Sequence, residues 1–208
     1  MVKRIPKESI ALNHLAAADT RLASIIKLVG AYEIKLRKDP FQSLVEAIIY
    51  QQLAGSAADA IYCRFKKIYN RFPSPAQILA TRNSKLRAAG LSSRKIDYLK
   101  DLASRIADGR LRLNHLPELT DEMVIEQLVQ VKGIGRWTAE MFLIFCLGRL
   151  DVLPVGDLGL RKAMQKAYSL AELPSPASMR EIAQLWKPYS SVATWYLWKS
   201  LEKFKGIG

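Results

Sequence analysis

The chain has 208 residues, of which 50% are hydrophobic and 25% charged, and its formal net charge at pH 7 is +13. This length suffices for one hydrophobic core, divided over two lobes, and the excess of positive charge favours a polyanionic partner such as nucleic acid. Because the basic residues are scattered along the chain rather than gathered in a tail, a soluble protein with a generously charged surface is the alternative.

Several classes of protein are excluded by the same composition. Cys63 and Cys146 are the two cysteines; each lies in an apolar helical pattern, so we expect two core residues and no disulfide framework or cysteine-rich metal site. The longest apolar run, 141–147, is too short to span a bilayer, and we expect a soluble, intracellular protein without a membrane partner. His14 and His115 lack acidic or cysteine companions, which disfavours a histidine-based metal site or nucleophile.

Helical periodicity runs through most of the chain. Apolar residues recur at spacings of three and four in the segments 41–49, 58–65, 99–106 and 123–129. Proline and glycine interrupt this pattern at 73–75, 90, 117, 133–135, 154 and 174–176. Since no alternating run exceeds about four residues, we predict an all-α fold of nine or ten helices, without strands.

The segment LVQVKGIGRWTAEMF (128–142) predicts two helices joined by a tight turn. Gly133 and Gly135 make the turn, and the second helix opens at Arg136. Glycine permits the backbone conformations of such a turn, and free N–H groups at a helix N-terminus bind anions. With Lys132 and Arg136 beside the turn, a phosphodiester is the natural anion.

This hairpin, the downstream Asp157 of LPVGDLG and the segment FQSLVEAIIYQQLAGSAADAI (41–61) together resemble the helix-hairpin-helix (HhH-GPD) DNA glycosylase superfamily. The resemblance extends from Asp39 onward and implies a single catalytic core over 1–208. In that core two helical lobes enclose a DNA-binding cleft: one lobe covers approximately 42–130, and the N-terminal segment with approximately 131–208 forms the other. It also implies a monomer that binds double-stranded DNA containing damaged bases. Some relatives carry an iron–sulfur cluster on four cysteines, which this chain lacks.

Asp157 has two interpretations. An aspartate just before a helical run is a favoured N-cap, and without the hairpin the cap is the better explanation. With the resemblance, Asp157 is the expected catalytic residue, because cleavage of an N-glycosidic bond builds positive charge on the deoxyribose and a carboxylate stabilises that charge. The two roles are compatible, since a cap fixes the orientation of the carboxylate.

Trp137 stands where bifunctional members of the family place a lysine that forms a Schiff base. An indole cannot attack the sugar, so the resemblance implies a monofunctional glycosylase that does not cut the strand. The same tryptophan resembles the 3-methyladenine DNA glycosylase II branch, whose aromatic pockets suit bases that carry positive charge. Trp198 matches a pocket tryptophan of that branch and Met141 is expected to line the pocket too, whereas Trp195 and Tyr196 are better explained as core residues.

Base flipping requires a side chain that fills the gap left in the duplex. Gln52 or Leu53, at the end of the 41–49 helix, is the candidate wedge, although the pair Gln51–Gln52 is also explained as a cap of that helix. The resemblance further implies a Na⁺ or K⁺ ion held by the backbone carbonyls of Val129, Val131 and Ile134, and no required cofactor. The expected DNA contacts are Lys132, Gly133, Ile134, Gly135, Arg136 and Thr138 of the hairpin, and Ser92, Arg94 and Lys95 of the turn AAGLSSRKIDYL.

The resulting hypothesis is a monofunctional DNA glycosylase that removes alkylated, 3-methyladenine-like purines in base excision repair. The alternative is a non-enzymatic helix-hairpin-helix DNA-binding protein, which needs neither Asp157 nor an aromatic pocket. A bifunctional glycosylase for oxidised bases is disfavoured by Trp137 and by the missing cysteines.

Overall fold

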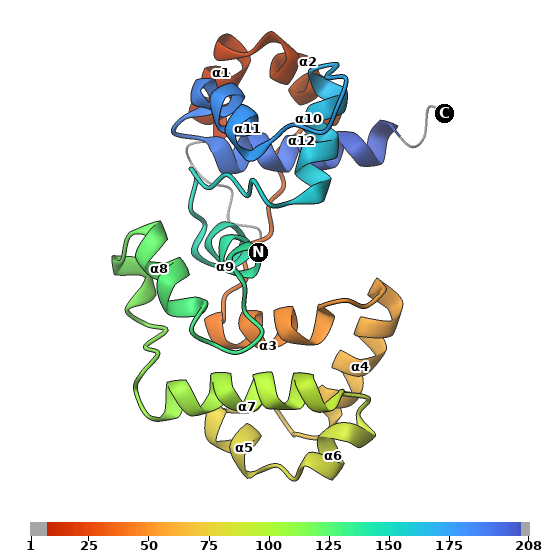
Figure 1. Cartoon of the computed structure of the whole chain (residues 1–208), viewed down its shortest axis with the longest axis vertical. Coiled ribbons are helices and arrows are strands. Elements are labelled where there is room, and N and C mark those ends of the chain that lie inside the picture. Colours follow the sequence, from red (N-terminus) through yellow and green to blue (C-terminus); the bar gives the residue numbers. More distant parts are fainter. Residues whose placement is uncertain (1–7, 205–208) are drawn as a thin grey trace. The chain divides into compact units, whose positions relative to one another are not determined.

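A computed structural model describes residues 8–204 and divides the chain into two compact units. The hairpin unit comprises residues 37–142, and the aspartate unit combines residues up to 36 with those from 143 onward. Both units are entirely helical in the described residues, which confirms the all-α prediction (Figure 1). The boundaries differ from the expected ones, because the whole helical hairpin up to residue 142 groups with the preceding helices.

The hairpin unit contains seven α-helices and one short 3-10 helix. They are α3 (Pro40–Tyr50), α4 (Gly55–Lys67), α5 (Pro75–Ala80), α6 (Asn83–Ala88), α7 (Ser93–Ala107), η1 (Leu116–Glu118), α8 (Asp121–Leu128) and α9 (Arg136–Phe142). The predicted total of nine or ten helices was too low, since the described residues hold twelve α-helices. Helices such as α5 and α6 are too short to show a helical period in the sequence.

The long helix α7 is central to the packing of the hairpin unit. It contacts α3, α5 and α6 (Figure 1). Ile96, Leu99 and Leu102 are fully buried on its inner face, as spacings of three and four require of a helix that packs on a core. Ser92 caps its N-terminus by accepting the Lys95 N–H at 3.3 Å. This hydrogen bond fixes the N-terminal end of α7.

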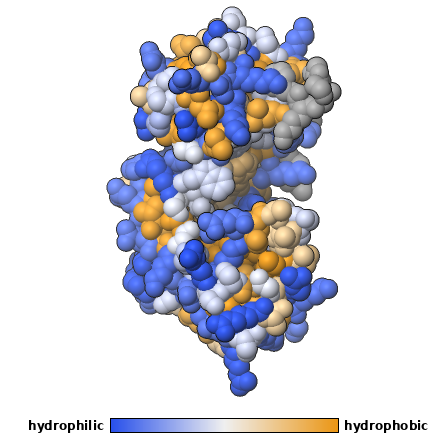
Figure 2. Space-filling view, turned by 45° about the vertical axis from the view of Figure 1, so that its right-hand side comes forward, coloured by the Kyte–Doolittle hydropathy of each residue, from blue (hydrophilic) through white to orange (hydrophobic). Residues whose placement is uncertain are grey.

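The aspartate unit is built from the two ends of the described chain. Its elements are α1 (Glu8–Ala18), α2 (Thr20–Val29), the π-helical turn η2 (Leu143–Leu147), α10 (Leu158–Ala167), α11 (Pro176–Ile182), the 3-10 helix η3 (Ala183–Trp186) and α12 (Ser190–Phe204). The helix α12 packs against α2 and α10. Figure 2 shows hydrophilic residues over much of the visible surface, with smaller apolar patches between them.

A buried polar cluster ties the aspartate unit together. The side chain of Asp19, 7% exposed, caps α2 and accepts hydrogen bonds from the Tyr168 hydroxyl and the Trp186 indole, which lies 3.2 Å away. Burial alone raises the pKa of Asp19, but the hydrogen bonds from Tyr168, Leu22, Trp186 and Arg21 outweigh it and hold that pKa below its usual value. The charged carboxylate therefore joins the start of α2 to the end of α10 and to η3.

Candidate DNA-binding hairpin and carboxylate site

The predicted hairpin turn joins α8 to α9 over residues 129–135. The second helix opens at Arg136, as expected. Within the turn, the Ile134 N–H donates to the Val131 carbonyl at 3.0 Å, and both of these side chains are buried. The apolar residues of the turn therefore anchor it, and its glycines stay exposed.

Gly133 occupies a position that no other residue fits. Its φ is +81°, in the left-handed region, and a Cβ atom there would lie 2.1 Å from the ring of Tyr98. At Gly135, by contrast, a Cβ would meet nothing within 4 Å. Within the described residues, the N–H groups of Gly133 and Gly135 make no hydrogen bond. Both groups are therefore open to an anion at the start of α9.

Asp101 of α7 supports the turn from inside the unit. Its carboxylate accepts the backbone N–H of Lys132 at 2.9 Å and the Arg105 side chain at 2.9 Å. Burial acts to raise the pKa of Asp101, but the hydrogen bonds from Lys132 and Arg105 outweigh it and hold the pKa below its usual value. The carboxylate is therefore charged at neutral pH. The Lys132 N–H is therefore used within the protein, while the Lys132 side chain is exposed.

Arg136 is held by carboxylates. Its guanidinium makes a two-point ion pair with Glu122 of α8, at 2.8 and 2.9 Å, and contacts Glu140 one turn along α9 at 3.2 Å. The pairing with Glu122 is the main reason that the pKa of Arg136 is raised. Arg136 thus links α9 to α8. Thr138, two residues later, is buried, with 6% of its surface exposed.

Two of the expected pocket residues lie one turn apart on α9. Trp137 is 47% exposed, which is unusual for the largest apolar side chain. Met141, four residues later, is half-buried. The spacing places the two side chains on the same face of the helix. That face offers an aromatic surface and a flexible thioether to a ligand of the hairpin unit.

The carboxylate of Asp157 is fixed by two donors. As predicted, Asp157 caps a helix: its Oδ1 accepts the Leu160 N–H of α10 at 2.5 Å. The same oxygen accepts the indole N–H of Trp198 from α12 at 2.8 Å. The structure therefore brings Asp157 and Trp198 into direct contact, and the N-cap role coexists with a side chain that is still partly exposed.

Trp198 is itself held in place from two sides. Its ring stacks on Phe145 with a centroid distance of 5.9 Å and an interplanar angle of 19°. Gly159 lies so close that a Cβ there would be 3.1 Å from the Asp157 carboxylate and 3.6 Å from the indole. By contrast, Trp195 and Tyr196 are buried in the core, as expected.

The candidate wedge residues lie in the turn after α3, residues 51–54. Gln52 is exposed and has a φ of +56°, a strained conformation for a residue other than glycine. Leu53 is 39% exposed. The Gln51 side chain does not cap α3; its amide donates to the Gly133 carbonyl of the hairpin turn at 2.7 Å. The turn therefore projects Gln52 and Leu53 outward while Gln51 fastens it to the hairpin.

The three residues expected to contact DNA beside this turn are placed differently from one another. Ser92 caps α7 and Arg94 is exposed. Lys95 directs its ammonium into the protein, where it donates to the carbonyls of Ile49 at 2.6 Å and Gln51 at 2.8 Å. Burial lowers the pKa of Lys95. Lys95 therefore caps the C-terminal end of α3.

The two cysteines differ in their exposure to solvent. Cys63 is exposed and Cys146 is half-buried, so the prediction that both are core residues was wrong for Cys63, whose helix α4 turns that face to solvent. No group of three or more His, Cys, Asp or Glu side chains within 8–204 is arranged to hold a metal ion. None of the helices in the described part of the chain is long and apolar enough to cross a membrane.

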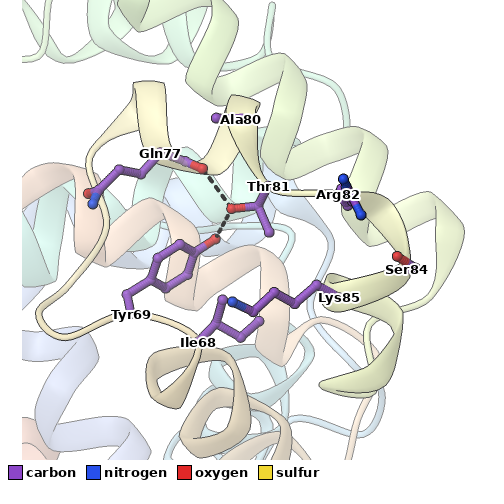
Figure 3. Close-up of a pocket in the computed structure, with 8 residues that line it drawn as sticks. All are labelled: Ile68, Tyr69, Gln77, Ala80, Thr81, Arg82, Ser84 and Lys85. Atoms are coloured by element: carbon purple, nitrogen blue, oxygen red, sulfur yellow. Dashed lines mark hydrogen bonds between the residues drawn. The ribbon is translucent and has the colours of Figure 1, made fainter.

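A hollow of about 670 Å³ beside α5 and α6 contains none of the expected site residues. Figure 3 shows three of its residues joined by hydrogen bonds: the Thr81 hydroxyl donates to the Gln77 backbone carbonyl at 2.7 Å and accepts from the Tyr69 hydroxyl at 2.9 Å. These groups are satisfied within the protein. The expected site residues lie elsewhere: the hairpin and the 51–54 turn belong to the hairpin unit, and Asp157 belongs to the aspartate unit.

Three supporting residues were missed by the sequence analysis. Tyr98 and Asp101 follow Lys95 at intervals of three, so all three share one face of α7. Polar residues at that spacing, beside the apolar face formed by Ile96, Leu99 and Leu102, were a signal. Glu122 carries no comparable signal, because its pairing with Arg136 depends on how α8 and α9 pack.

Comparison with known proteins identifies the family. Residues 45–188 match the model of the HhH-GPD superfamily of base excision DNA repair proteins. The chain is 39% identical to DNA-3-methyladenine glycosylase 1 of Schizosaccharomyces pombe, over 90% of this chain and 85% of that protein.

Two solved structures extend the likeness to three dimensions. The S. pombe 3-methyladenine DNA glycosylase in complex with abasic DNA aligns with a TM-score of 0.83 and 38% identity, over 92% of this chain and 96% of that one. A DNA-3-methyladenine glycosidase from Bacillus halodurans aligns with a TM-score of 0.87 and 37% identity, over 99% and 94%. The chain therefore belongs to the HhH-GPD superfamily of base excision DNA repair proteins.

Proposed function

We propose that this protein is a monofunctional DNA-3-methyladenine glycosylase, which hydrolyses the N-glycosidic bond of alkylated purines in duplex DNA. The observation that carries the proposal is the carboxylate of Asp157, fixed by the Leu160 N–H and the Trp198 indole. A helix-capping role needs only the first of these bonds. The relatives named 3-methyladenine glycosylases support the substrate class.

In the proposed reaction, the hairpin binds the DNA backbone and Asp157 serves the sugar. The open N–H groups of Gly133 and Gly135 and the exposed Lys132 side chain bind phosphate oxygens. As the bond from the sugar to the base breaks, its electrons leave with the base and positive charge develops on the deoxyribose, which the carboxylate stabilises. Water then adds to the sugar carbon and loses a proton, leaving an abasic site.

We infer that the protein does not cleave the DNA strand. Trp137 occupies the hairpin position where a lysine would form a Schiff base, and an indole has no nucleophilic amine. Lys95, the half-buried lysine of α7, is engaged with two backbone carbonyls. The product is therefore an intact strand with an abasic site.

Recognition of the base rests on the aromatic side chains. An alkylated purine with positive charge is attracted to an aromatic face, by about 0.5–2 kcal/mol, and is already a good leaving group. We propose that Trp137, Met141 and Trp198 contribute to base binding. Gln52 or Leu53 of the 51–54 turn then occupies the space left by the flipped base.

The ion expected at the hairpin fits the residues present. The Val131 carbonyl accepts one hydrogen bond, from Ile134, and a carbonyl oxygen has a second lone pair. We propose that this carbonyl, with those of Val129 and Ile134, would hold Na⁺ or K⁺, which would stabilise the turn and attract a phosphate. We infer that the hydrolysis requires no cofactor and that the protein acts as a monomer.

The deciding experiment is incubation of the purified protein with methylated duplex DNA. Free bases are measured by chromatography, and strand breaks are scored with and without alkali. We expect released 3-methyladenine and breaks only after alkali. Breaks without alkali would contradict the monofunctional assignment. DNA binding without any released base would favour a non-enzymatic DNA-binding protein.

A further inference from the structure

Lys95, Tyr98 and Asp101 form one polar row along α7, and each supports a loop expected to meet DNA. Lys95 holds the carbonyls of Ile49 and Gln51 at the end of α3. Tyr98 lies against Gly133, and Asp101 holds the Lys132 N–H. A single rigid helix therefore supports both the 51–54 turn and the hairpin turn.

The two turns are also joined directly. The Gln51 side chain donates to the Gly133 carbonyl at 2.7 Å, on the residue that packs over Tyr98. The contacts thus close a ring from α7 to the 51–54 turn, on to the hairpin turn and back to α7. A closed ring of short contacts fixes the distance between two loops better than either contact alone, because neither loop moves without breaking a bond.

The energetic balance at Lys95 favours a positioning role over a contact with DNA. Its ammonium has lost part of its hydration, and two carbonyls at a helix C-terminus replace that hydration with charge-assisted hydrogen bonds. To reach a phosphate, the side chain would have to leave both carbonyls unpaired. The neighbouring Arg94 is exposed and pays no such cost.

We propose that Lys95, with Tyr98 and Asp101, is a positioning residue that holds the 51–54 turn at a fixed distance from the hairpin turn. This fixed distance lets the protein recognise DNA in which a base is missing from the stack. The role in DNA rests on the proposed glycosylase function. The support of the 51–54 turn by Lys95 does not depend on that function. The support and the role in DNA binding are therefore tested in separate experiments.

The support is tested by hydrogen exchange of the free protein. The Lys95→Met variant keeps the length of the side chain and removes its donors; Lys100→Met, on the same helix, is the matched control. We expect amide exchange in residues 51–54 to rise about tenfold in Lys95→Met, to stay unchanged in Lys100→Met and to be restored largely by Lys95→Arg. Unchanged exchange in Lys95→Met would overturn the proposal, whatever the protein does to DNA.

The DNA role is tested by binding to two duplexes, one intact and one with a tetrahydrofuran abasic analogue. For Lys95→Met we expect the preference for the abasic duplex to fall about tenfold, with intact-duplex affinity and its salt dependence unchanged. A phosphate contact predicts the opposite: equal loss on both duplexes and a salt slope reduced by about one. That second result would overturn the positioning role.

Should Lys95→Met fail to fold, Gln51→Ala tests the same ring from its exposed side. Its exchange and duplex preference are expected to change in the same direction. Failure of the wild-type protein to release bases would count against the proposed function alone, since the exchange measurement involves no DNA.

Discussion

At the scale of the residue, the Asp157 side chain caps a helix and, in the proposed function, also stabilises the charge that develops on the sugar. Its Oδ1 accepts two hydrogen bonds, one from the helix it caps and one from Trp198. The bond to the helix anchors the carboxylate to the backbone, and the indole fixes its rotation. A preorganised carboxylate is more effective against developing positive charge than one that must reorient during the reaction.

For Asp157→Asn we expect excision to fall by about a hundred- to a thousandfold, because the amide keeps the capping acceptor and loses the negative charge. Affinity for abasic duplex and the thermal midpoint should change little. Single-turnover base release measures the rate of excision, and thermal unfolding measures the midpoint. Asp39→Asn is the control, since Asp39 caps α3 in the same way. Equal losses in both variants would mean that Asp157 is only a cap.

For Trp198→Phe we expect the rate of excision to fall about 10- to 100-fold, the effect of removing a hydrogen bond to a charged group. Phenylalanine retains an aromatic ring that stacks on Phe145, so the fold and the aromatic surface are largely kept. Base-release kinetics should show the loss mainly in the maximal rate. A rate equal to that of the wild type would show that the indole N–H does not position Asp157.

At the scale of the element, the hairpin turn depends on α7 for its shape. Gly133 has a left-handed backbone and lies against Tyr98, whereas Gly135 has open space around its α-carbon. The two glycines of one motif therefore serve different purposes. Gly133 is needed for the fold of the turn, and in the proposed function Gly135 leaves the start of α9 accessible to a phosphate.

For Gly133→Ala we expect a loss of more than about 1 kcal/mol of stability, because the backbone is strained and the Tyr98 ring must move. The affinity for every duplex, damaged or intact, should fall by a similar factor. For Gly135→Ala we expect unchanged stability, measured by urea unfolding, and weaker DNA binding in a fluorescence titration. A stable Gly133→Ala variant with normal affinity would contradict the assigned role of the turn.

The ends of the aspartate unit are joined by the buried carboxylate of Asp19. Its pKa is lowered in the folded state, so its contribution to stability is complete above the unfolded pKa and is lost as pH falls through the folded pKa. We expect Asp19→Asn to cost about 1–3 kcal/mol at pH 7. Urea unfolding between pH 7 and pH 3 should show this difference shrinking on the acid side; a difference independent of pH would contradict it. The exposed cap Asp39 provides the comparison variant.

At the scale of the whole molecule, the formal net charge of +13 favours binding to DNA, and such binding weakens as the salt concentration rises. Each phosphate neutralised by the protein contributes a slope of about −0.9 to the dependence of log affinity on log salt concentration. Much of the positive charge is dispersed, and some of it, such as that of Arg136, is paired with carboxylates. The slope therefore reports contacts with phosphate and not the total charge.

For Lys132→Ala we expect this slope to become shallower by about one, with a similar loss of affinity on every duplex sequence. Lys199→Ala is the control, because the Lys199 ammonium is already paired with Glu202 at 2.9 Å. Affinities measured by fluorescence anisotropy at several salt concentrations give both slopes. An unchanged slope in Lys132→Ala would remove that side chain from the phosphate contacts.

The sequence by itself determined the all-helical fold, the hairpin with its second helix opening at Arg136, and Asp157 as a helix cap. These features depend on local spacing and on the conformational freedom of glycine, which neighbouring residues reveal. The sequence also indicated which aromatic residues belong to the core.

Only the tertiary structure decided which polar groups are already used. Lys95 binds two carbonyls 44 and 46 residues away in sequence, Lys132 gives its N–H to Asp101, and Arg136 is paired with Glu122. An exposed lysine and a buried one look the same in a sequence. The difference arises because long-range packing brings a carbonyl or carboxylate to the side chain, and that packing is set by helices far apart in the chain.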